Sequence, residues 1–149
     1  ETAISLRQLP KRIGNRNRKS SLMLVLDENI DRIQREQLSQ WRFRFRHIGN
    51  DVASKGIKDD RIQTVLHQLK QPTFFSWDRD FYKRELLHRH HCIVYLDVKQ
   101  FEIAEYIRKT LKHEAFSTKT SRMGKVIRVS PTLVQYWELN ANEEKHFFW

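Results

Sequence analysis

The sequence has one cysteine, three prolines and four glycines among its 149 residues. The single thiol, Cys92, excludes an internal disulfide and is typical of a reducing compartment, so we expect a cytoplasmic protein. The scarcity of glycine and proline leaves little chain for linkers, and the length suits one compact domain. No apolar stretch approaches the roughly 20 residues that span a bilayer, so no membrane association is expected.

Several catalytic signatures are also missing. The sequence has no P-loop, no GxGxxG motif and no GxSxG motif, which argues against P-loop nucleotide binding, a dinucleotide fold and a serine hydrolase. "HRHHC" at 88–92 has no matching His or Cys pair at finger-like spacing, so the sequence does not favour zinc. Cys92 lies inside an apolar run and is expected to be a core residue, not a nucleophile.

Positive charge is abundant and unevenly distributed. Lys and Arg number 28 against 18 Asp and Glu, for a net charge of +10. Residues 1–21 contain six Lys or Arg and a single Glu, which predicts a flexible basic arm with affinity for phosphates. Nucleic acid is therefore the expected partner, with Arg12, Arg16 and Arg18 as candidate RNA contacts.

Hydrophobic patterning predicts strands that alternate with helices. The expected strands are 22–26, 41–48, 72–77, 92–98 and 125–130, and the expected helices are 30–41, 59–70, 81–89, 100–113 and 131–139. This alternation is typical of an α/β domain with a mostly parallel sheet.

Four carboxylates are expected along one edge of that sheet. Asp27 closes the first strand, Asp78 and Asp80 follow the third, and Asp59 begins the helix after the second. Because the carboxyl ends of parallel strands share an edge, these side chains would gather there and favour Mg²⁺ or Mn²⁺. A bound metal activates water and neutralises the leaving oxygen of a phosphodiester. The alternative is that Asp59, Asp80 and Asn29 are only helix N-caps.

The motifs "LVLDEN", "GIKDDRI" and "FSWDRDF", in this order, resemble those of the PIN-like nucleases, in particular a compact bacterial group. The resemblance covers roughly residues 22–130. It implies a three-layer α/β/α fold, with residues 22–149 forming one domain that has a C-terminal extension after about residue 130. It also implies Mg²⁺- or Mn²⁺-dependent endoribonuclease activity, often that of a toxin held inactive by a cognate antitoxin protein.

The resemblance also implies roles for individual residues. The catalytic set would be Asp27, Asp59, Asp78 and Asp80, with Asp27, Asp78 and Asp80 as metal ligands and Asn29 and Ser76 in support. The sequence departs from the pattern at Ser76, where threonine is usual, and at Trp77, where a polar residue is more common.

Basic residues near the acidic motif and aromatic residues near the C-terminus are candidate binding residues. Arg79 lies within the acidic motif, Lys83 and Arg84 follow it closely, and all three are candidate RNA contacts. An aromatic cluster near the C-terminus suggests a homodimer or an inhibitor surface. A non-catalytic module that binds nucleic acid or protein on the same scaffold is the competing hypothesis, since positive charge favours either function.

Overall fold

The computed structural model describes residues 22–49 and 59–149, with the backbone alone for Asp59 and Asp60. The predicted basic arm, 1–21, lies outside the described residues.

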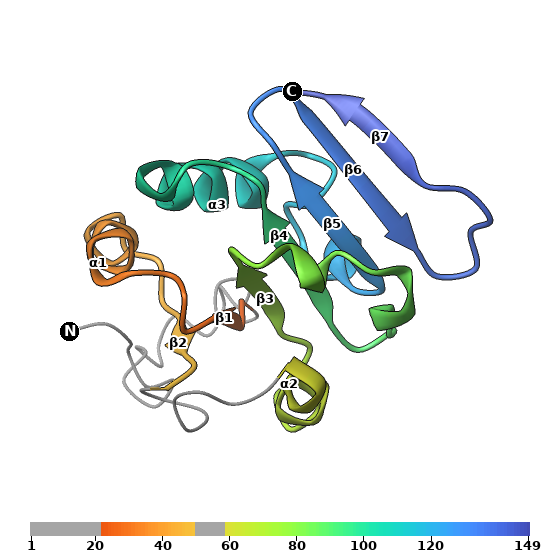
Figure 1. Cartoon of the computed structure of the whole chain (residues 1–149), viewed down its shortest axis with the longest axis horizontal. Coiled ribbons are helices and arrows are strands. Elements are labelled where there is room, and N and C mark those ends of the chain that lie inside the picture. Colours follow the sequence, from red (N-terminus) through yellow and green to blue (C-terminus); the bar gives the residue numbers. More distant parts are fainter. Residues whose placement is uncertain (1–21, 50–58) are drawn as a thin grey trace, which may run out of the picture.

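A seven-stranded sheet forms the centre of the molecule (Figure 1). Its spatial order is β2-β1-β3-β4-β5-β6-β7. The strands β1 to β5 are parallel to one another, and β6 and β7 continue the sheet antiparallel. The bounds are β1 Leu24–Leu26, β2 Arg46–His47, β3 Thr73–Ser76, β4 Cys92–Leu96, β5 Lys125–Val129, β6 Leu133–Glu138 and β7 Lys145–Phe148.

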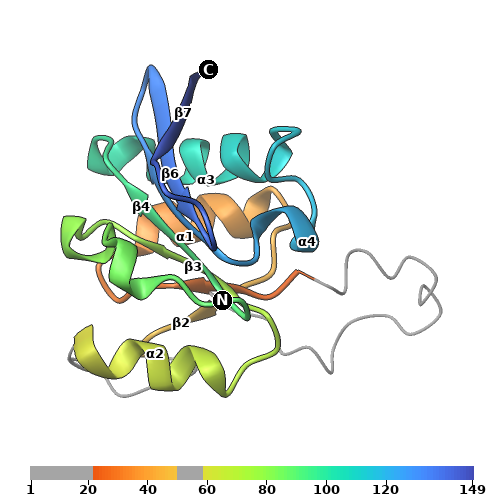
Figure 2. The same ribbon diagram turned by 90° about the vertical axis from the view of Figure 1, so that its right-hand side faces the viewer.

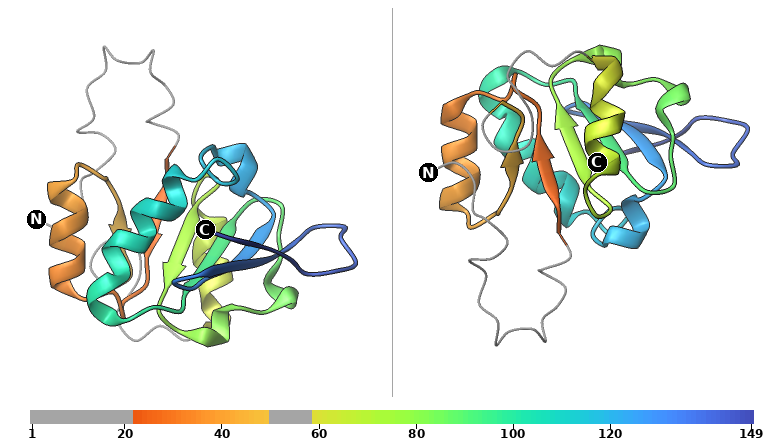
Figure 3. Two further views of the ribbon diagram at one scale, coloured as in Figure 1. Left: turned by 90° about the horizontal axis from the view of Figure 1, so that it is seen from above. Right: turned by 90° about the horizontal axis from the view of Figure 1, so that it is seen from below.

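Helices cover both faces of the sheet (Figures 2 and 3). One face carries α1, Arg32–Gln40, and α3, Ile103–Lys112. The other carries α2, Asp59–His67, and the short 3₁₀ turns η4, Arg79–Phe81, and η5, Arg84–Leu86. The turn η6, Gln100–Glu102, precedes α3, and α4, Lys119–Arg122, precedes β5. The predicted three-layer α/β/α fold is confirmed.

The core is divided by the sheet into two clusters. Leu24, Leu26 and Phe75 belong to the cluster beneath α1 and α3, whereas Val25 and Phe74 belong to the cluster beneath α2. All of these side chains are at most 1% exposed, as expected for parallel strands covered on both faces. No helix of the described residues is long and apolar enough to cross a membrane.

The sheet order places a topological switch point between β1 and β3. The chain leaves β1 through α1 and returns on one side of it as β2, then crosses through α2 to the other side as β3. Open α/β sheets bind ligands at the carboxyl ends of the two strands that flank such a point.

The predicted strand at 41–48 is present at the edge of the sheet but is shorter than predicted. It pairs only at Arg46–His47, because Trp41 ends α1 and Arg42 adopts a positive φ of 71°. The predicted helix at 131–139 is wrong: Leu133–Glu138 form the strand β6, and Val134 and Tyr136 on one side of it pack on the core.

The predicted helix at 81–89 is also wrong, and so are two of the predicted caps. That segment is divided between η4 and η5, and the carboxylate of Asp78, not that of Asp80, accepts from the free N–H of η4. The helix α1 is capped by Asp31, whose Oδ1 accepts from the Gln34 amide at 2.9 Å, and not by Asn29.

Candidate functional site

Asp27 lies at the carboxyl end of β1, directly beside the end of β3. Its backbone N–H donates to the Phe75 carbonyl at 2.9 Å, which extends the pairing of the two strands by one residue. The side chain is only 7% exposed. Its Oδ2 accepts from the Ser76 hydroxyl at 2.6 Å and its Oδ1 from the Glu28 N–H at 2.8 Å, so the carboxylate is held in one orientation.

Ser76 connects Asp27 to the second acidic residue. Besides donating to Asp27, its Oγ accepts from the backbone N–H of Asp78 at 3.0 Å. Asp78 Oδ1 in turn accepts from the Asp80 N–H at 2.9 Å. Asp27, Ser76, Asp78 and Asp80 thus form one hydrogen-bonded row across the switch point. The Asp78 and Asp80 carboxylates make no ion pair with any residue in the described part of the chain.

Asn29 and Trp77 hold the neighbouring loops together. Asn29 Oδ1 accepts from the Trp77 backbone N–H at 3.2 Å, which links the turn after β1 to the end of β3. The Trp77 indole N–H donates to the Val98 carbonyl at 2.8 Å, which extends the connection to the loop after β4. Asn29 therefore supports the row without being part of it.

The predicted RNA contacts lie in different settings. Arg79 is exposed between Asp78 and Asp80, and Lys83 is exposed shortly after them. Arg84 turns away from it, since its guanidinium donates to the Ala141 carbonyl at 2.9 Å and lies 4.7 Å from the centre of the Trp137 ring. Arg12, Arg16 and Arg18 lie outside the described residues.

Asp59 is the first residue of α2, as predicted for the helix start. Its side chain lies outside the described part of the structure.

A further carboxylate that was not predicted, that of Asp97, lies at the same edge. Asp97 directly follows β4, and its backbone N–H donates to the Val129 carbonyl at 2.7 Å. Its Oδ2 accepts from Arg128 Nη2 at 2.6 Å and Nε at 3.1 Å. These bonds and the charge of Asp97 raise the pKa of Arg128. The sequence carried a signal, because "VYLD" ends an apolar strand on aspartate just as "LVLD" does.

Among the described side chains, Asp27, Asp78 and Asp80 lie in a row and do not gather around one point. In the described side chains, the group of three His, Cys, Asp or Glu ligand atoms within 4.8 Å of one another consists of His67, His88 and His91. Asp27, Asp78 and Asp80 form no such trio. Mg²⁺ needs only one or two protein carboxylates, since water and substrate phosphate fill its other positions.

Comparison with protein-family models, with curated proteins and with solved structures finds no match for this chain. The function is therefore inferred from the residues and their arrangement.

Proposed function

We propose that the protein is a metal-dependent endoribonuclease of the PIN-like kind that hydrolyses RNA phosphodiester bonds. The observation that supports this proposal best is the row Asp27-Ser76-Asp78 at the switch point between β1 and β3. The buried Ser76 hydroxyl orients the Asp27 carboxylate and also binds the loop that carries Asp78. It thereby fixes the positions of two carboxylates at this edge of the sheet. Exposed Arg79 and Lys83 next to it supply positive charge for a phosphate backbone.

The donor set fits Mg²⁺ or Mn²⁺. Asp27, Asp78 and Asp80 offer only carboxylate oxygens, the hard ligands that these ions prefer. The Asp78 carboxylate accepts one hydrogen bond, from the Asp80 N–H, and a carboxylate oxygen has two acceptor sites. A bound ion would supply activation of a water molecule and neutralisation of charge on the phosphodiester.

The rest of the site acts by positioning. Ser76 and the Glu28 amide fix the Asp27 carboxylate, and the Asn29 amide fixes the turn that leads to Asp78. Preorganised carboxylates do not have to reorient when substrate arrives. We further propose, on the resemblance of its motifs alone, that the protein is the cytoplasmic toxin of a toxin–antitoxin pair.

A non-catalytic nucleic-acid-binding module is the second candidate function. It is favoured by the absence of a carboxylate trio among the described side chains, together with the net charge of +10. Such a module would bind RNA with strong salt dependence, would not respond to EDTA and would leave the RNA intact.

Cleavage of a panel of single-stranded RNAs, with Mn²⁺ and with EDTA, separates the two functions. The informative variant is Asp78→Asn, which keeps the Oδ1 acceptor for the Asp80 N–H while removing the charge. We expect cleavage by the wild type with Mn²⁺, none with EDTA, and a loss of at least about 100-fold in the variant.

Asp31→Asn is the matched control. It removes one charge from the loop after β1, and asparagine caps α1 as well as aspartate does. This control should cleave like the wild type. Cleavage by Asp78→Asn at the wild-type rate, or cleavage that persists in EDTA, would refute the proposed function.

A further inference from the structure

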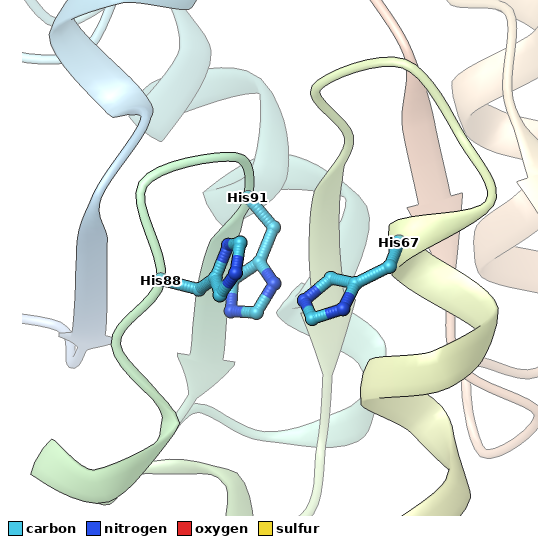
Figure 4. A group of neighbouring side chains, drawn as sticks. All are labelled: His67, His88 and His91. Carbon is cyan, nitrogen blue, oxygen red and sulfur yellow. The ribbon is translucent and has the colours of Figure 1, made fainter.

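Three histidines gather at the edge of the sheet opposite the acidic row (Figure 4). His67 is the last residue of α2, and His88 and His91 lie in the turn that leads into β4. One ring nitrogen from each residue lies within 4.8 Å of one from each of the others. The ring centroids are 4.2 Å apart for His67 and His88, 5.5 Å for His67 and His91, and 5.3 Å for His88 and His91.

His91 has a free nitrogen lone pair in a buried position. The residue is 0% exposed, and its Nε2 lies 2.8 Å from the Leu86 carbonyl oxygen. Because a carbonyl only accepts, Nε2 carries the proton and Nδ1 carries the lone pair. That Nδ1 is buried and has no hydrogen-bond partner among the described residues. Buried nitrogen atoms are normally paired, so this atom indicates a missing partner.

The hydrogen bond from His91 Nε2 to the Leu86 carbonyl resembles the bond that metal-binding histidines make with the ring nitrogen that does not contact the metal. A ligating imidazole usually donates its other N–H to a carbonyl or carboxylate, which fixes the tautomer and directs the lone pair at the metal. In Figure 4 the His67 and His88 rings lie against the His91 ring, on the same side of the sheet. Two further imidazoles therefore lie beside the His91 ring.

The two turn histidines differ in the hydrogen bonds that their ring nitrogens make. His88 is the ligand that has to move, since its Nδ1 accepts from the His90 backbone N–H at 3.1 Å. His90 is exposed, so water can replace that bond.

The geometry requires only a small closure. Tetrahedral coordination at metal–nitrogen distances of 2.0–2.1 Å places neighbouring ligand nitrogens about 3.3 Å apart. In the structure without an ion, the three ligand nitrogens already lie within 4.8 Å of one another, so each pair has to close by at most about 1.5 Å. His67 is exposed at a helix end and His88 is half-buried, so both rings have room to turn toward buried His91.

One side of the cluster opens to solvent. A cavity of about 400 Å³ is lined by His67, Leu69, Lys70, Gln71, His88 and His90. This opening leaves a fourth position for water, as in zinc sites with three protein ligands. Cys92 does not belong to the set, because its side chain packs in the core on the α3 face of the sheet.

We propose that His67, His88 and His91 bind a Zn²⁺ ion that ties the end of α2 to the turn before β4. Three neutral imidazoles suit Zn²⁺ and its neighbours in the transition series, and they exclude Mg²⁺ and Ca²⁺, which take oxygen ligands. This site is separate in place and in ligand chemistry from the acidic row.

The test is titration of Zn²⁺ into the metal-free full chain, without a histidine tag, by calorimetry. Titration with Co²⁺, followed by the visible absorption that tetrahedral cobalt gives, reports the coordination geometry. We expect one ion per chain in the wild type, and binding weaker by at least about 100-fold in His67→Gln and in His88→Gln. His67 is exposed, so its variant keeps the fold, which circular dichroism checks.

Two controls define the site. His90→Gln removes a third histidine from the same cavity wall and should bind Zn²⁺ within about threefold of the wild type. Asp78→Asn should bind Zn²⁺ as the wild type does, which keeps this result independent of the proposed nuclease site. The proposal is overturned if the wild type binds no Zn²⁺, if His67→Gln and His88→Gln bind as tightly as the wild type, or if His90→Gln loses as much.

Discussion

The hydroxyl of Ser76 joins Asp27 to the loop that carries Asp78, so Ser76→Ala is the most informative perturbation. The bond from Ser76 Oγ to Asp27 Oδ2 is 2.6 Å long, and Ser76 and Asp27 are 0% and 7% exposed. A hydrogen bond to a charged group contributes about 1.5–3 kcal/mol. Alanine leaves almost no cavity. We therefore expect the free energy of unfolding to fall by about 2 kcal/mol.

A double-mutant cycle isolates this bond from the other contacts that Asp27 makes. Urea unfolding of the wild type, Ser76→Ala, Asp27→Ala and the double variant is measured in EDTA, so that no metal contributes. We expect a coupling free energy of about 1.5–3 kcal/mol between the two positions, and Ser76→Thr, which keeps the hydroxyl, to stay within about 1 kcal/mol of the wild type. Additivity of the two changes within about 0.5 kcal/mol would show that the bond does not hold the row together.

Two further predictions concern buried groups. Cys92 is 0% exposed, and burial raises the pKa of its thiol to about 12. The native protein at pH 8 should therefore not react with an aromatic disulfide reagent, whereas the protein unfolded in urea should react completely. Rapid reaction of the native protein would contradict this burial. Arg122 is 1% exposed and donates to the Thr73 hydroxyl and to the Phe116 carbonyl, each at 2.9 Å, so Arg122→Ala should lower the free energy of unfolding by about 3 kcal/mol in urea titrations. A loss below about 1 kcal/mol would mean that these contacts contribute little.

The central parallel strands β1, β3 and β4 were predictable because they are short runs of buried, mostly apolar residues. "LMLVL", "TFFS" and "CIVYL" pack both faces against helices, so their sequences carry no polar side and are recognisable without knowledge of their partners. The C-terminal strands were not predictable in the same way. Ser130-Pro131 looks like a helix start, and only the pairing of Val134 with Val129 and with Phe147 makes this segment a strand.

The acidic edge was predictable to the level of the strand ends. Asp27 and Asp78 follow apolar strands, and parallel pairing brings them to one edge wherever the helices lie. The roles within the row depend on tertiary detail. Nothing in "FSWDRDF" indicates that the Ser76 hydroxyl reaches Asp27, or that the Asp78 carboxylate caps the following turn.

The histidine cluster could not be predicted, because His67 comes from a different element. Its position beside His88 depends on how the end of α2 packs against the turn before β4. Local spacing within "HRHHC" therefore gave no sign of a third ligand.

The pairing of β1 with β3 also sets an order for folding. Asp27 and Ser76 are 49 residues apart in the chain, and α1, β2 and α2 lie between them. A contact of this separation forms slowly compared with the antiparallel β5-β6-β7 region, whose strands are neighbours in sequence. During synthesis, a nascent chain that ends before β3 carries Asp27 without its serine partner. The acidic row therefore does not exist on a growing chain until β3 has left the ribosome, and truncated products that stop short of β3 would lack it.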